Sequence, residues 1–141
     1  MTTIARLLVR ADAELLAAQF SAEPWERFTH AHLAAVRAAA AVVAARGRPS
    51  GRGVPSAVWE LLAVVAPELG RWAAVFADGA RLRAALEAGR FEVVDGARAE
   101  QALCDAEDFV DAARAAAAPD PAHVDGATAA AAPRMLAVRA S

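Results

Sequence analysis

The chain has 141 residues, a formal net charge of −2 and alanine at 43 positions. Its 38 larger apolar side chains suffice for one thin hydrophobic core and exclude two separate domains. Because alanine is the strongest helix former and β-branched residues other than valine are rare, a sheet-rich fold is excluded. One cysteine and three histidines exclude an intrachain disulfide framework and a usual structural zinc site.

The first predicted helix begins after a Thr2 or Thr3 cap and ends near Phe20. Apolar residues recur along it at helical spacing, and this core-facing stripe consists of Ile4, Leu8, Ala11, Leu15 and Ala18. Ser21 and Pro24 then restart the chain, since proline is well tolerated in a first helical turn.

The second helix is predicted from Pro24 to Arg46, with Gly47 as its stop, and it is the longest. At 1.5 Å per residue it measures roughly 34 Å and forms the spine of the domain. Its core stripe contains Trp25, Phe28, His32, Val36, Ala39 and Val43. A second stripe is predicted to face solvent or a partner, and it contains Arg27, His30, Ala34, Arg37 and Ala41.

Residues 47–55 are predicted to form a flexible basic loop, because they hold three glycines, two prolines and two arginines. Ser56 is predicted to cap a third helix, which Pro67 kinks or restarts. A fourth helix follows, with a break predicted at Asp78-Gly79 and an end at Gly89.

The last helix is predicted over residues 97–118, with its acidic residues on the outside. Residues 119–141 are rich in alanine and proline and are predicted to be a disordered tail. The predicted fold is therefore an all-α bundle of four or five helices over residues 1–118. Because so thin a core buries little area, we expect a homodimer.

Charge is distributed unevenly along the chain. Residues 1–55 carry seven arginines against four acidic residues, whereas residues 97–118 carry two arginines against five. The net charge gives no general reason to expect nucleic-acid binding. The longest uncharged apolar run, residues 38–45, is far shorter than the ~20 residues of a membrane span, and charges interrupt any signal peptide. We expect a cytoplasmic protein with no membrane association and with neither cofactor nor metal.

The candidate catalytic pair is Arg27 and His32. An arginine that stabilises a phosphorane and a histidine that shuttles a proton can together cleave RNA without a metal. Five residues of helix place the two about 140° apart, so one chain does not easily bring both to one phosphate, although two copies could. The alternative, which the pattern favours, is that His32 is a packed core histidine and Arg27 a solvated or salt-bridged arginine.

Other candidate residues carry weaker signals. Four arginines, in the second helix and the loop after it, are candidates for contact with phosphate: Arg37, Arg46, Arg48 and Arg52. Cys104 is predicted to be a small core residue, in an acidic helix whose carboxylates raise a thiol pKa.

Three stretches of the chain resemble HEPN domains of actinobacteria. They are RFTHAHLAAVRAAAAVVAARGRP (27–49), VWELLAVVAPELGRWAAVFADGARLRAALEAG (58–89) and ARAEQALCDAEDFVDAA (97–113). The resemblance implies an all-helical bundle, commonly homodimeric, linked in many HEPN families to RNA cleavage or nucleotide binding.

The catalytic signature of these domains is an arginine, four to six residues, and then a histidine. Arg27 and His32 fit that spacing, but Phe28 stands where a polar residue is usual, and the pair lies in the second helix rather than later. We therefore predict a dimeric binding or interaction module that associates with a protein encoded nearby, RNA or a nucleotide. The alternatives are a metal-independent ribonuclease of the toxin or defence type and a purely structural subunit.

Overall fold

The computed structural model describes residues 1–119, and in this part of the chain five α-helices carry the fold. They are α1 (Thr3–Phe20), α2 (Pro24–Arg46), α3 (Val58–Val65), α4 (Gly70–Glu87) and α5 (Gly96–Ala117), with short 3-10 turns at Pro67–Leu69 and Phe91–Val93. No strand occurs within residues 1–119, so the predicted all-α bundle with a long second helix is confirmed. The predicted tail, residues 119–141, lies outside the described residues except for Pro119.

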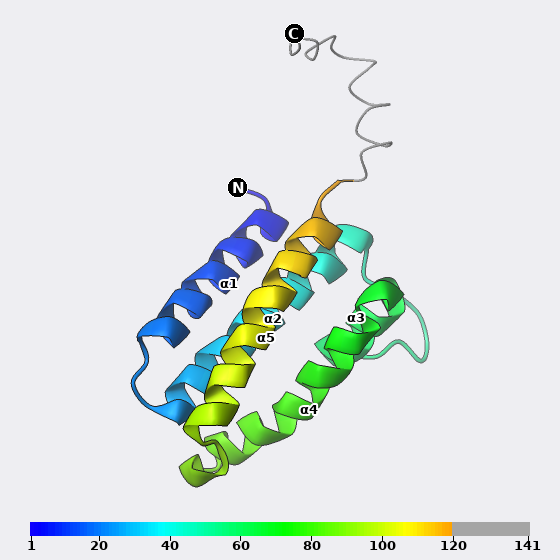
Figure 1. Cartoon of the computed structure of the whole chain (residues 1–141). Helices are drawn as coiled ribbons and strands as arrows, with labels where there is room; N and C mark the ends of the chain where they lie inside the picture. Colours follow the sequence, from blue (N-terminus) through cyan, green and yellow to red (C-terminus); the bar gives the residue numbers. More distant parts are fainter. Residues whose placement is uncertain (120–141) are drawn as a thin grey trace, which may run out of the picture.

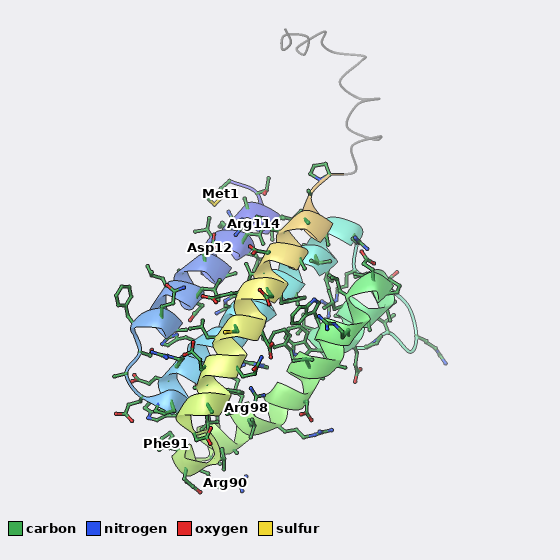
Figure 2. All side chains as sticks on the ribbon, in the orientation of Figure 1. Met1, Asp12, Arg90, Phe91, Arg98 and Arg114 are labelled. Atoms are coloured by element: carbon green, nitrogen blue, oxygen red, sulfur yellow. The ribbon has the colours of Figure 1, made fainter. Side chains whose placement is uncertain are left out.

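The long helix α2 is the centre of the bundle, and α1 and α5 pack along it (Figure 1). Helices α3 and α4 follow one another as a rod on another side, and both contact α2. The N-terminus and the end of α5 lie at the same end of the bundle, where Arg114 of α5 pairs with Asp12 of α1 at 2.8 Å (Figure 2). The central position of α2 confirms its predicted role as the spine.

Local signals set most helix ends where the sequence predicts them. The Thr2 hydroxyl accepts a hydrogen bond from the Ala5 N–H at 3.0 Å, and α2 stops at Gly47, whose φ of 95° favours glycine. At α5, the Asp95 carboxylate accepts a hydrogen bond from the Arg98 N–H at 2.8 Å. The predicted Ser56 cap is wrong, because α3 begins one residue later and Ala57 precedes it without a side-chain cap.

The face of α2 predicted to be open is mostly closed. Ala34 and Ala41 are both 0% exposed, and each of the other residues of that stripe is partly buried. The reason is that α1 and α5 both pack on α2, which the small alanine side chains allow at short interaxial distance. Six alanines of this helix are fully buried, namely Ala31, Ala34, Ala35, Ala38, Ala39 and Ala41.

Helix α4 continues through Asp78-Gly79, so the predicted break is wrong. A Cβ at Gly79 would lie 3.4 Å from Nδ1 of His32 and 3.7 Å from Cζ of Phe28. The glycine therefore marks a close approach of α4 to α2, and it keeps a helical conformation. By contrast, Pro67 restarts the chain as predicted, since α3 ends at Val65 and the proline begins a 3-10 turn.

Alanine also makes α2 long and apolar enough, by length and composition alone, to cross a membrane. In the structure this helix is the central one, and more than half of its most apolar window is buried against the rest of the bundle. The core helix of a bundle passes the same length and composition test, so the result is weak evidence for a membrane span.

Candidate functional site

Arg27 lies at the end of the first turn of α2 and contacts three separate segments. Its Nε donates to the Ala18 carbonyl at 3.2 Å, and its Nη2 donates to the Ser21 carbonyl at 3.0 Å. Its Nη1 pairs with a carboxylate oxygen of Glu100 on α5 at 2.8 Å. These contacts engage all three nitrogens of the guanidinium and hold the end of α1, the turn after it and α5 together.

His32 lies in the core, and its side chain is packed among aromatic rings. The residue is 3% exposed. Its imidazole stacks on Phe28 at 6.1 Å between ring centroids and meets Trp59 and Phe76 edge-on at 6.1 and 6.3 Å. The prediction that His32 belongs to the core stripe of α2 is confirmed.

The surroundings of His32 keep its imidazole uncharged at neutral pH. Burial, together with the positive charges of Arg83 and Arg98, lowers its pKa from 6.5 to about 4. A general acid or base in RNA cleavage works best with a pKa near the operating pH. The imidazole is therefore poorly suited to protonating a leaving group at pH 7.

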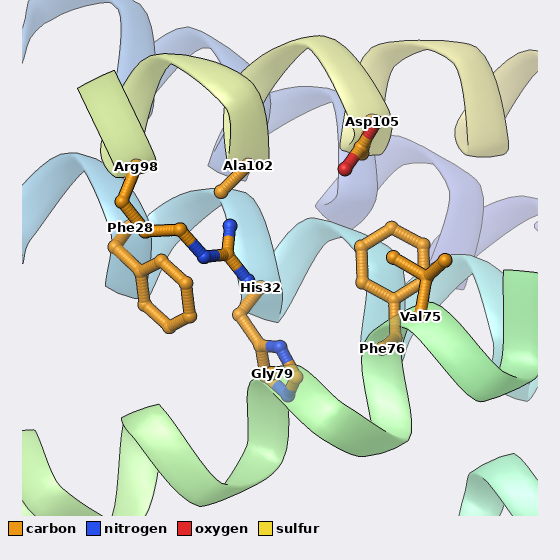
Figure 3. Close-up of a pocket in the computed structure, with 8 residues that line it drawn as sticks. All are labelled: Phe28, His32, Val75, Phe76, Gly79, Arg98, Ala102 and Asp105. Carbon is orange, nitrogen blue, oxygen red and sulfur yellow. The ribbon is translucent and has the colours of Figure 1, made fainter. Parts of the chain in front are cut away.

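A small cavity adjoins His32 between α2, α4 and α5 (Figure 3). In this view the Arg98 side chain extends from α5 toward His32, and Asp105 lies farther along the same helix. The Arg98 guanidinium lies 5.1 Å from the centre of the Phe28 ring. The cavity measures about 10 Å³, which at most fits one water molecule and leaves no room for a nucleotide.

The structure does not bring Arg27 and His32 together in one chain. Arg27 is held by residues of α1, the following turn and α5, whereas His32 faces Trp59 of α3 and Gly79 of α4. This arrangement follows from the rotation of about 140° that five residues of helix impose. The candidate catalytic pair thus lacks a shared site within residues 1–119.

The four candidate phosphate-binding arginines are not gathered on one surface either. Arg46 donates to the Val65 carbonyl at 3.2 Å and pairs with Glu68, so it fastens the end of α2 to the end of α3. The Nε of Arg37 is buried without a hydrogen-bond partner, about 13 Å along α2 from Arg46. Only Arg48 and Arg52 share a segment, the loop between α2 and α3.

Cys104 is exposed on α5, so the prediction of a core position is wrong. Partial desolvation and the neighbouring carboxylates, Glu100 first among them, raise the pKa of the thiol. A raised pKa disfavours the thiolate, so the residue is not an activated nucleophile. Among residues 1–119 no three histidine, cysteine or acidic side chains are grouped so that they could hold a metal ion.

Two surface features were not predicted from the sequence. Helix α1 exposes Val9, Leu16 and Phe20, which are 54%, 53% and 82% exposed. Their spacing of seven and four residues is itself a helical pattern, hidden by the stronger stripe on the opposite face. The other feature is a hollow of about 310 Å³ between α2 and α3, beside Arg48.

The comparison with protein families gives a match to a HEPN family. The family described as HEPN_SAV_6107-like HEPN matches residues 18–118, which is most of the bundle and extends from the end of α1 to the residue after α5. Comparisons with curated proteins and with solved structures each gave no match. The chain belongs to the HEPN_SAV_6107-like HEPN family.

Proposed function

We propose that this HEPN domain is a non-catalytic interaction module that forms a two-fold dimer through the outward face of α1. The observation that carries the proposal is that α1 is apolar on two opposite sides. Ala11 and Ala18 are 0% exposed and face the core. Val9, Leu16 and Phe20 lie within about 40° of arc on the opposite side.

When a helix has two apolar faces, each face is typically covered by other parts of a protein. A two-fold interface pairs a patch with itself, which suits a stripe with no charge along its centre. The edges of the stripe carry charged residues, since Arg6 lies on one edge and Asp12, which is paired with Arg114 of α5, lies on the other. The proposed dimer therefore rests on apolar contact between the two stripes and not on ion pairs between their edges.

The catalytic alternative has less support from the geometry. The Arg27 guanidinium is already bound by Glu100 and two carbonyls, and the His32 imidazole is buried and uncharged at neutral pH. Dimerisation through α1 neither frees the Arg27 guanidinium nor exposes the His32 imidazole. RNA, a nucleotide or a protein encoded nearby would then be bound on a surface of the module, without cleavage.

Light scattering of the full chain tests the dimer. We expect a dimer at micromolar concentration and a monomer for the double variant Leu16→Glu/Phe20→Glu. Both side chains are more than half exposed, so the variant keeps its helical circular dichroism. Val64→Glu on α3, a residue 56% exposed, is the matched control and stays dimeric. A wild-type chain that is monomeric at micromolar concentration would contradict the proposal.

A further inference from the structure

The second unpredicted feature, the hollow between α2 and α3, has walls of one chemical kind. The residues that form these walls are aliphatic: Ala40, Val43, Ala44, Val58 and Leu61. No aromatic ring lines the hollow. A nucleobase would find no ring on which to stack there, whereas a flexible hydrocarbon chain fits methyl-lined walls. Its volume of about 310 Å³ is at the lower end of the range for small-molecule sites.

Two polar side chains complete the lining, and both come from the segment that joins α2 to α3. Arg48 lies two residues after the end of α2, and Ser56 lies two residues before the start of α3. None of the ion pairs formed among residues 1–119 involves Arg48. An arginine presents several N–H donors to a carboxylate, and a serine hydroxyl adds one more.

The loop that joins α2 to α3 borders the hollow through Arg48 and Ser56. Gly47, Gly51 and Gly53 all have positive φ, with open space where a Cβ would stand. The loop between them carries Arg48, whereas the walls belong to helices packed in the core. Aliphatic walls beside an arginine suit a ligand with an apolar body and an anionic end.

We propose that the hollow binds a medium-chain aliphatic carboxylate, with the hydrocarbon against the α2 and α3 walls and the carboxylate on Arg48 and Ser56. The charge of Arg48 selects a carboxylate over an alcohol or an amine of the same chain length. The site is separate from the outward face of α1, so binding does not depend on the proposed dimer.

Octanoate, octanol and octylamine are the probes, and NMR of the valine and leucine methyl groups of the full chain is the measurement. We expect octanoate to shift the methyl signals of Val43, Val58 and Leu61 in a saturable way. Octanol should bind about tenfold more weakly, and octylamine more weakly still.

Three variants locate the ligand. Arg48→Gln should weaken octanoate binding about tenfold, to the level of octanol. Arg52→Gln removes the same charge from the same loop but from outside the hollow, and should leave binding unchanged. Ala44→Leu fills the hollow from an exposed position, so the protein still folds while binding of every probe is lost.

Four results would overturn the proposal. The first three are the absence of saturable octanoate binding, equal affinity for octanoate and octanol, and equal losses of octanoate affinity in the Arg48 and Arg52 variants. The fourth is an NMR contact, without any ligand, between the hollow and the methyl group of Met135, which would show that the chain itself fills the hollow.

Discussion

Lowering the pH from 7.5 to 5 should destabilise the protein through His32. The unfolded chain binds a proton on this imidazole with an ordinary pKa of 6.5, and the folded chain binds it only near pH 4. The contribution of the uncharged imidazole to the free energy of unfolding is therefore fully present above pH 6.5. It is lost as the pH falls toward 4. Each pH unit in that window removes up to about 1.4 kcal/mol from the free energy of unfolding.

The expected loss from this one group is about 3 kcal/mol in total and about 2 kcal/mol by pH 5. Charged neighbours face the imidazole from two helices: Arg83 on α4, with Arg98 and Asp105 on α5. Most carboxylates are still ionised at pH 5, since their ordinary pKa values are about 4. The interval from pH 7.5 to 5 therefore separates histidine titration from that of the carboxylates, and histidine variants assign the effect to His32.

Urea denaturation followed by circular dichroism, at fixed protein concentration, measures the effect. His32→Leu removes the titrating group without adding a polar atom, and should lose about 2 kcal/mol less than the wild type over this interval. His30→Gln, a change on the same helix, should leave the His32-dependent loss in place. Equal losses in the wild type and His32→Leu would refute the argument that burial keeps the imidazole uncharged.

The remaining predictions concern packing and catalysis. Gly79→Ala should raise the free energy of unfolding by up to about 1 kcal/mol, because the new methyl group makes ordinary contacts and favours the helix. Gly79→Leu should lower the free energy of unfolding, because the larger side chain overpacks the contact with α2. Urea denaturation measures both changes. Arg27→Ala should lower the free energy of unfolding by about 1–3 kcal/mol, because the partly buried Ser21 carbonyl loses its donor and the Ala18 carbonyl keeps only the Ser21 N–H, whereas Glu100→Ala on the exposed side should cost less than about 1 kcal/mol. Purified protein incubated with RNA in EDTA should show no cleavage above the level of His32→Ala; cleavage that His32→Ala abolishes without a change in melting temperature would establish the ribonuclease.

The helix ends were predictable because their causes are local. Thr2, Pro24 and Gly47 act through their own backbone and side-chain geometry, which does not depend on the remainder of the chain. Gly79 shows the limit of such signals. Glycine follows the end of α2, whereas Gly79 lies inside α4, where the close approach of α2 leaves room only for a small side chain.

Burial was harder to predict wherever alanine dominates. Ala34 and Ala41 share a stripe with Arg27 and Arg37 that is predicted to face solvent or a partner, yet both alanines are fully buried. Alanine occurs both in the core and at the surface, so the hydrophobic pattern of an alanine-rich helix does not distinguish its buried side from its exposed side. In contrast, the bulky Phe28 identified the core side of α2, and with it the position of His32.

The sequence predicts on which sides of α2 the two candidate catalytic residues lie, but it does not predict which residues contact them. The helical period alone places Arg27 and His32 on different sides of α2. Nothing in the sequence indicates that Glu100, 73 residues away, pairs with Arg27, or that Trp59 and Phe76 close over His32. These contacts depend on how α5 and the α3–α4 rod dock, which is a tertiary property.

The packing of this bundle restricts where it can act on another molecule. Alanines let α1, α2 and α5 approach closely, while the largest rings fill the space between α2, α5 and the α3–α4 rod. There the ring centroids of Trp59, Phe76 and Phe109 lie within 6 Å of one another. With the interior filled in both ways, the space beside His32 holds no substrate. A partner or ligand must instead use apolar surface that the bundle leaves uncovered, and the outward face of α1 and the hollow beside Arg48 both provide it.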